Sequence, residues 1–493
     1  WRSVYMTFSA HYAFKSRYIA DFSIRRDGTT KFGDNKRWGN FPALSFRWNV
    51  VDEPWMRGTQ KWLSMLSLRP GWGRVGSQPT DEYLFFSKYT GTDSYNGANS
   101  IYPSNIRLSN LQWEEKETWN VGFDLGFFNN MITADFNIYT QMTSKLLMRD
   151  VKLPSSSGFS SLSWTNVGKM RNNGWEFNVN GTDVVKVGKF RLGFNVTFAN
   201  NKNEIVEMDP TALSSLNKDF DNKNGSYLTR IQLNNPFGAI YGFRYKGVYQ
   251  YSDYSDVEVP GVSGPNAPVA RDENGNVIRD KAGFTIPMVF GYDKTTNTEL
   301  YEFQGGDAIY EDINHDGNIN ELDIVYLGSS LPKITGGWGL KFSYGRWSLN
   351  AQFNFRVGNK VINEARMNAE SMYNNNNQAA SVNWRWRTEG QLAEIPRALY
   401  NKGFNYLGSD RFVEDASFMR LNYLSLGYSL NPKLLRRIGV TSLSINLNAS
   451  NLFCLTNYSG ADPEVSYGGM NVATDGAKTP RSRQFTARVQ IGF

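Results

Sequence analysis

The stretch VGFDLGFFNNMITADFNIYT, residues 121–140, carries the pattern that decides the fold. On both sides of the Asn129-Asn130 pair, alternate positions are apolar, and the positions between them are polar or glycine. A period of two residues is the spacing at which the side chains of a β-strand return to the same face. The stretch therefore predicts two strands joined by a short turn, each with one apolar face and one polar face.

The same period recurs along the whole chain of 493 residues. Thirteen strands are predicted from it, at residues 4–14, 17–25, 41–50, 64–75, 118–127, 131–140, 172–183, 190–201, 334–343, 346–356, 416–430, 443–455 and 484–493. Such alternation is also typical of a soluble β-sandwich or β-propeller. It predicts an all-β fold, but it does not by itself select the class of β protein.

The connections between the predicted strands separate a membrane barrel from a soluble fold, because they alternate in length. Short connections are predicted at 15–16, 128–130, 184–189 and 344–345, and long ones at 76–117, 141–171, 202–333, 357–415 and 456–483. Connections 51–63 and 431–442 are longer than a tight turn, and 26–40 is short for a long loop. Short turns on one side and long loops on the other are typical of outer-membrane barrels. The predicted fold class is therefore a transmembrane antiparallel β-barrel with its long loops outside the cell.

The ends of the strands agree with this prediction. Trp48, Trp119 and Tyr139 lie near predicted strand ends, where the aromatic girdles of a membrane barrel are found. The chain finishes with RQFTARVQIGF, residues 483–493, whose alternation runs to a terminal aromatic residue, Phe493. A last strand that ends on Phe is the mark of outer-membrane barrels, and it places Phe493 at the periplasmic rim.

Composition excludes several other classes of protein. The mean hydropathy is −0.49, and no stretch reaches the roughly 18 consecutive apolar residues of a membrane-spanning helix. One cysteine, Cys454, and two histidines exclude internal disulfides and disfavour catalysis by histidine. The net charge is +7, but the basic residues form no run, so no nucleic-acid partner is predicted. Acidic pairs such as Glu114-Glu115 lie at strand ends, where acids serve solvation and turns, so no enzyme is predicted.

One loop has the spacing of a calcium site. In DINHDGNINELD, residues 312–323, oxygen ligands are expected from Asp312, Asn314 and Asp316, from the carbonyl of Asn318, and from Asp323 in place of the usual Glu. Gly317 allows the sharp turn between them. Two interpretations stay open: a Ca²⁺ site, and an Asx-rich turn that holds no metal. In both interpretations, the loop is a structural element that fastens the long outer connection 202–333 and is not a reaction centre.

Several segments together resemble one known family. They are SIRRDGTTKFGDNKRWGNFPALSFRWNV (23–50), LSLRPGWGRVGSQP (66–79), LQWEEKETWNVGFDLGFFNN (111–130), NVGKMRNNGWEFNVNGT (166–182), PFGAIYGFRYKGVYQ (236–250), RFVEDASFMRLNYLSLGYSLNPKLL (411–435) and NLFCLTNYSGADPE (451–464). In this order they resemble the C-terminal part of a SusC/RagA-type TonB-dependent outer-membrane transporter. Plugged transporters of this size have 22 strands. The resemblance implies that residues 1–493 are the C-terminal portion of such a barrel. About nine strands, the plug domain and the TonB box are then expected from a further segment or another chain.

The resemblance also implies a function in the outer membrane. It implies active import of bulky nutrients, oligosaccharides or peptides, driven through TonB, with a SusD-like lipoprotein as a lid on the extracellular loops and outer-membrane lipid around the barrel. Aromatic side chains in the outer loops suit stacking on sugar faces and suit a lid interface equally well: Tyr83, Phe85, Tyr89, Trp384 and Trp386. Two alternatives of other classes are a passive porin and a calcium-dependent surface adhesin that binds through the 202–333 loop.

Overall fold

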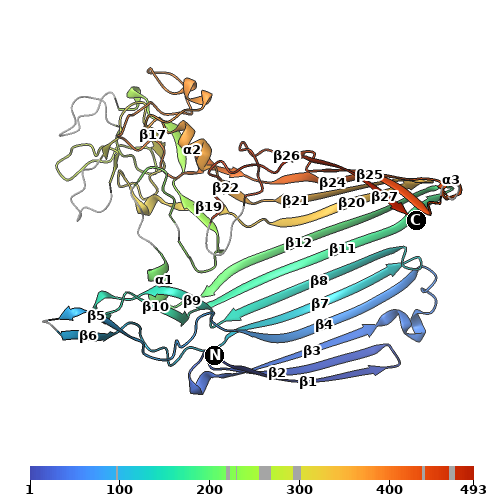
Figure 1. The fold of residues 1–493 in the computed structure, drawn as a ribbon. Helices are drawn as coiled ribbons and strands as arrows, with labels where there is room; N and C mark the ends of the chain where they lie inside the picture. Colours follow the sequence, from blue (N-terminus) through green and yellow to red (C-terminus); the bar gives the residue numbers. More distant parts are fainter. Residues whose placement is uncertain are drawn as a thin grey trace.

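The computed structural model describes residues 1–95, 98–217, 223–228, 230–254, 268–291, 301–435, 439–465 and 472–493. Long strands dominate it, and they run side by side in one large sheet (Figure 1). Among the residues it describes, no helix combines the length and the apolar character needed to cross a membrane.

Thirteen strands form the sheet in the order of the chain, and each pairs antiparallel with the next. They are β1 (Ser3–Phe14), β2 (Tyr18–Thr29), β3 (Trp38–Asn49), β4 (Leu63–Ser77), β7 (Glu114–Phe127), β8 (Ile132–Ser144), β11 (Lys169–Val187), β12 (Phe190–Glu207), β20 (Ile334–Tyr344), β21 (Trp347–Val357), β24 (Phe418–Ser429), β25 (Ser442–Ser450) and β27 (Gln484–Gly492). A short strand, β26 (Cys454–Thr456), also pairs with β24. The thirteen predicted strands and their antiparallel order are confirmed.

The connections keep the predicted alternation of sides. The short ones lie together at one end of the sheet, and the loop-rich ends lie at the other (Figure 1). The two short-side connections that are longer than a tight turn contain short helices: η2 (Val50–Asp52) and η3 (Pro54–Met56) in one, and α3 (Pro432–Leu435) in the other. The helices take up the extra residues, so neither connection breaks the parity.

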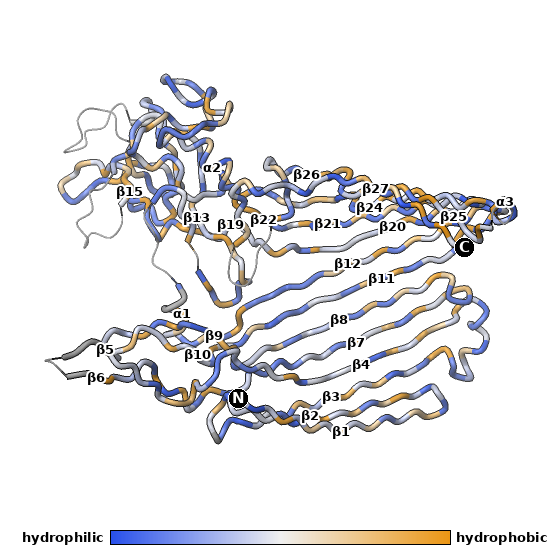
Figure 2. Tube along the Cα trace, viewed as in Figure 1, coloured by the Kyte–Doolittle hydropathy of each residue, from blue (hydrophilic) through white to orange (hydrophobic). Residues whose placement is uncertain are grey.

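Hydrophobic and hydrophilic residues alternate along the strands (Figure 2), so the two faces of the sheet differ. One row across neighbouring strands consists of Leu68, Phe123, Phe136, Phe177 and Phe198, each opposite the next. The adjacent row on the other face consists of Ser67, Asp124, Asp135, Asn178 and Thr197. Side chains crowd together on the inside of a curved sheet, and Ser67 is 1% exposed whereas Phe123 is 37% exposed. The polar face is therefore the inside of the curve, and the apolar face is the outside.

The loop-rich end contains many short elements that alternation did not predict. The strands are β5 (Tyr89–Tyr95), β6 (Ala98–Pro103), β9 (Leu147–Lys152), β10 (Ser161–Asn166), β13 (Ala239–Gly242), β14 (Tyr245–Val248), β15 (Val289–Phe290), β16 (Tyr301–Glu302), β17 (Ala308–Tyr310), β18 (Asn318–Ile319), β19 (Val325–Ser329), β22 (Lys360–Ile362) and β23 (Val413–Asp415). The helices are α1 (Pro210–Leu216) and α2 (Glu364–Glu370), with 3₁₀ turns η1 (Asp34–Lys36), η4 (Ser155–Ser157), η5 (Tyr251–Tyr254), η6 (Glu321–Asp323), η7 (Ala380–Trp384) and η8 (Asp410–Phe412). Most of these strands have two to six residues, too few for a two-residue period to stand out.

The strand order predicts which connections a reagent outside the cell can reach. In a full-length protein freed of its native cysteines, including Cys454, single cysteines at Ser87 and Glu273 should react with an impermeant maleimide on whole cells. A cysteine at Asn129 should react only after lysis, because Asn129 lies in the short turn after β7, at the opposite end of the sheet. Labelling of Asn129 on intact cells would contradict this orientation.

Candidate functional site

The polar face of the sheet carries a network of charged and amide side chains. Asp124 of β7 accepts a hydrogen bond from Arg69 Nη2 (2.6 Å), and on the next strand Asp135 Oδ1 accepts from Asn137 and Asn178 (3.3 and 3.1 Å). Because Asp124 and Asp135 lie directly opposite each other, these donors offset the repulsion between the two carboxylates. The inner face can therefore offer both donors and acceptors to a polar solute.

The described residues of the connections 208–333 and 358–417 fold together at the loop-rich end, and we call their shared structure the outer-loop unit. Its buried apolar core draws on both connections: Leu228, Ala239, Tyr241, Phe243, Tyr249, Ala270, Met288, Phe290, Phe303, Ala308, Tyr310, Ile319 and Leu407. Backbone hydrogen bonds cross between the connections, from Phe243 N to Gly408 O (2.9 Å) and from Arg397 N to Gly306 O (2.7 Å). Neither connection is therefore an independent loop.

A buried ion pair lies at the junction of the two connections. Asp307 is fully buried, and its carboxylate accepts from Arg397 Nε (2.7 Å), from Tyr301 Oη (2.7 Å) and from Asn405 Nδ2 (3.3 Å). Burial disfavours the charge on Arg397, but the carboxylate of Asp307 outweighs that effect and raises the arginine's pKa. The guanidinium of Arg397 therefore stays charged, and the pair clamps the junction.

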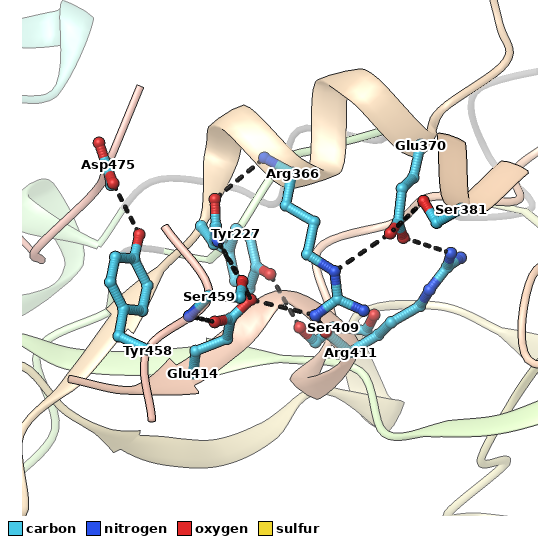
Figure 3. Close-up of polar contacts among 11 residues, drawn as sticks. Tyr227, Arg366, Glu370, Ser381, Ser409, Arg411, Glu414, Tyr458, Ser459 and Asp475 are labelled. Carbon is cyan, nitrogen blue, oxygen red and sulfur yellow. Dashed lines mark hydrogen bonds and ion pairs between the residues drawn. The ribbon is translucent and has the colours of Figure 1, made fainter. Parts of the chain in front are cut away.

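A second network alternates in charge along the base of α2 (Figure 3). The carboxylate of Glu370 accepts hydrogen bonds from Arg366 Nε (3.2 Å) and Arg411 Nη2 (2.8 Å). Arg366 Nη1 also donates a hydrogen bond to Glu414 Oε1 (3.0 Å). Burial opposes the charge on Glu414, but hydrogen bonds from Ser459 and Arg366 outweigh it and lower its pKa. The two guanidinium groups are thus held in place by carboxylates before any ligand arrives.

A cavity of about 790 Å³ opens beside this network. Arg366, Glu370 and Arg411 line one part of it, and Trp384 and Leu392 line another. The Arg411 guanidinium also lies over the Tyr245 ring, 5.3 Å from its centroid. The cavity therefore combines fixed charges with apolar surface, as ligand pockets of this size commonly do.

The five aromatic candidates do not share one site. Trp384 is 78% exposed and lines the cavity, whereas Trp386 is 5% exposed and donates its indole N–H to Gln250 Oε1 (3.1 Å). Tyr83 and Tyr89 are exposed on a different connection, 78–113, where Phe85 is 9% exposed and packs on Phe86 at 4.2 Å between ring centroids. Phe85 and Trp386 therefore have packing roles in this conformation, and three of the five present their rings to solvent.

Sequence reasoning missed the charged lining of the cavity. The Arg366–Glu370 spacing of four residues on a helix is a local signal that could have been found. Arg411 and Glu414 come from another part of the chain, so no spacing in the sequence pairs them with Arg366.

The predicted calcium loop is closed by its own backbone. Asp312 Oδ2 accepts from Gly317 N (2.8 Å), and Asp323 Oδ1 accepts from Ile313 N (2.8 Å). Gly317 has φ +78°, as the sharp turn requires. Among the described residues, no group of three or more His, Cys, Asp or Glu side chains has an arrangement that could hold a metal ion. The oxygen chemistry suits calcium, but the carboxylates would have to turn from the backbone N–H groups toward the ion.

An antiparallel sheet that is apolar outside, polar inside and long-looped at one end defines an outer-membrane β-barrel. Residues 4–286, more than half of the chain, match the family model described as TonB dependent receptor-like, beta-barrel. The chain belongs to this family and is an outer-membrane protein.

Within the family, it is similar to proteins of the SusC and RagAB kind. It is 28% identical to TonB-dependent receptor P39 of Formosa agariphila and 26% identical to TonB-dependent receptor SusC of Bacteroides thetaiotaomicron; each match covers 98% of this chain, and 45% and 43% of those proteins. The solved structure of the RagAB peptide transporter matches with a TM-score of 0.75 and 24% identity, over 100% of this chain and 48% of that one. The chain thus spans about half the length of the proteins it matches.

Proposed function

We propose that the full-length protein imports bulky nutrients, oligosaccharides or peptides, across the outer membrane with energy delivered through TonB. One observation carries the proposal. The same chain combines a polar, curved inner face with an outer-loop unit that has a preorganised cavity of about 790 Å³. In a barrel of about 22 strands, further strands must complete the wall that this chain begins. The lumen of such a barrel is too wide to leave open, so a plug must close it. Opening a plugged lumen requires work, and the outer membrane has no energy source of its own.

A SusD-like lipoprotein on the outer-loop unit is part of this proposal. Leu392 is fully exposed and Trp384 is 78% exposed, both at the cavity. Exposed Trp side chains beside a pocket are common anchors of protein interfaces. A lid seated there would close over cargo held in the cavity, with the part-exposed Arg366 available to carboxylates or sugar hydroxyl groups.

Uptake of labelled cargo tests the proposal against the passive-porin alternative. Accumulation must depend on the proton gradient if TonB drives it, whereas a porin lets solutes equilibrate without energy. The adhesin alternative needs the 202–333 loop to act as a separate binding module, whereas the described residues of this loop share their buried core with Leu407 of the second connection.

We also propose that Asp312, Asn314, Asp316, Asn318 and Asp323 bind Ca²⁺. The support is electrostatic: Asp323 is fully buried, and this burial, with Asp312 and Asp316 nearby, raises its pKa to about 6. A cation would relieve this concentration of negative charge. The side-chain Oδ1 of Asn318, an atom distinct from the carbonyl expected as the ligand, is also buried and has no hydrogen-bond partner among the described residues.

Calcium should slow hydrogen exchange in residues 301–329 of the full-length protein relative to the same protein in a chelator. At a concentration about ten times Kd, the expected stabilisation is about 1.4 kcal/mol, or about tenfold in exchange rate. Asp316→Ala should abolish the effect. Asp280→Ala is the matched control, because Asp280 also accepts two backbone N–H groups in a tight turn (2.9 and 2.9 Å). Equal exchange with and without calcium would favour the metal-free turn.

A further inference from the structure

The apolar outer face of the sheet is hollowed at one place. A cavity of about 970 Å³ lies across strands β3, β4, β7, β8, β11 and β12. We call it the Trp groove, and its main lining side chains are Trp72, Trp119, Val121, Ile138, Trp175 and Lys202. It does not belong to the outer-loop unit or to the inner face.

The register places the groove on the outer face. Val121, Ile138 and Trp175 form one row across three strands, in phase with the apolar row that contains Phe123, two residues further along β7. The next row toward the loops contains Trp72, Trp119, Thr140, Asn173 and Lys202, each opposite the next. Since side chains two residues apart share a face, all of these residues face the membrane side.

The rows also give the depth of the groove in the membrane. One row beyond the tryptophans lie ion pairs: Arg74 Nη2 is 3.2 Å from Glu117 Oε2, and Arg171 Nη1 is 3.3 Å from Glu204 Oε1. Successive rows are about 6.7 Å apart. Over about 13 Å the face thus passes from apolar side chains through tryptophan to charges, which is the sequence found at a membrane–water interface. These rows lie toward the long loops, so this is the outer leaflet.

The groove has a fixed wall. The indole N–H groups of Trp72 and Trp119 both donate to Glu117 Oε1 (2.9 and 3.1 Å), and the ring centroids are 5.9 Å apart. Because Arg74 in turn holds Glu117, the two rings cannot swing into the hollow without breaking these bonds. These hydrogen bonds therefore keep the hollow open even when no ligand fills it.

The two sides of the groove differ in polarity. Opposite the tryptophan pair, the row ends in Asn173 and Lys202, and the Lys202 side chain is 72% exposed. Glu204 lies between two cations, Lys202 Nζ at 3.3 Å and Arg171 Nη1 at 3.3 Å. Two positive charges against one negative charge leave this side with a net charge of +1.

We propose that the Trp groove binds one acyl chain of a phosphate-bearing lipid of the outer leaflet, with the chain on Val121, Ile138 and Trp175 and the head group at Asn173 and Lys202. Three features argue for a lipid as the occupant. The groove is continuous with the lipid-facing surface, its rows pass from apolar to charged side chains, and its polar side has a net positive charge. A lipid held here would be a bound ligand and not only part of the surrounding solvent.

Native mass spectrometry of the full-length protein tests this, with phosphatidylglycerol and a phosphate-free diacylglycerol glycolipid as probes. The wild type should retain one phosphatidylglycerol on activation. Trp175→Ala removes a large apolar contact with the acyl chain, and Ile138→Trp fills the hollow while keeping the face apolar; each should weaken retention about tenfold. Phe177→Ala, one row below on the same strand, is the control and should retain lipid as the wild type does.

A second variant tests whether the lipid phosphate lies at Lys202. Lys202→Gln should reduce the preference for phosphatidylglycerol over the glycolipid about threefold, as one exposed charge pair would. Equal retention by wild type, Trp175→Ala and Ile138→Trp would overturn the proposed site. Equal retention of both lipids by the wild type would overturn the assignment of a phosphate at Lys202.

Discussion

Accumulation of labelled cargo should fall to the level of cells that lack this protein when the proton gradient is collapsed, while binding at the cell surface persists. Binding draws on contact free energy at the outer-loop unit, and the cavity beside Arg366, Arg411 and Trp384 is formed without energy input. Translocation through the proposed plugged lumen needs work. The two steps should therefore separate when energy is withdrawn.

The experiment uses the full-length protein in living cells and measures surface-bound and internal cargo separately. In the proposed function an N-terminal segment contacts TonB, and removing that segment should reproduce the effect of the uncoupler in energised cells. Cells that express an ordinary porin are the matched control, because small solutes continue to equilibrate in them. Uptake that continues unchanged without a proton gradient would replace active transport by a passive channel.

Asp307→Ala should open the outer-loop unit, with a loss of about 3–5 kcal/mol in its free energy of local unfolding. The substitution leaves Arg397 charged and part-buried and takes the acceptor from Tyr301 and Asn405. Hydrogen exchange should accelerate by about two to four orders of magnitude in both 301–310 and 397–408, because the pair joins the two connections.

Glu311→Ala is the matched control within the same unit. Glu311 pairs with Arg244 (3.0 Å) and Lys246 (2.8 Å), whose side chains are 49% and 48% exposed. Water replaces such partners readily, so the cost should stay below about 1 kcal/mol. A double-mutant cycle with Arg397→Met should give a coupling energy well above that of the Glu311 pair. Equal acceleration by Asp307→Ala and Glu311→Ala would show that Asp307 does not clamp the unit.

The long strands could be found from sequence because their information is local. Whether a residue such as Phe123 faces lipid or lumen depends only on its parity along the strand, and a strand of ten or more residues repeats that signal several times. The alternation of short and long connections then gave the class of barrel and the side on which the loops lie. The same locality explains the Asp312–Asp323 motif, whose spacing is readable although its metal stays a prediction.

The outer-loop unit was beyond sequence reasoning because its contacts are not local. Asp307 and Arg397 are 90 residues apart, and Arg366 meets Glu414 across 48 residues. Strands of two to four residues, such as β15 and β17, carry too few positions to reveal a period. Trp384 and Trp386 show the limit most clearly: two residues apart, one lines a cavity and the other is buried.

The sequence by itself determined the strands, their order, the two faces and the sides of the connections, since each follows from a short-range period or from loop length. Tertiary structure alone decided which loops share a core, which charges meet at the cavity, and that Trp72, Trp119 and Trp175 border one groove. Register between strands brings those tryptophans together, and register is set by pairing across the whole sheet.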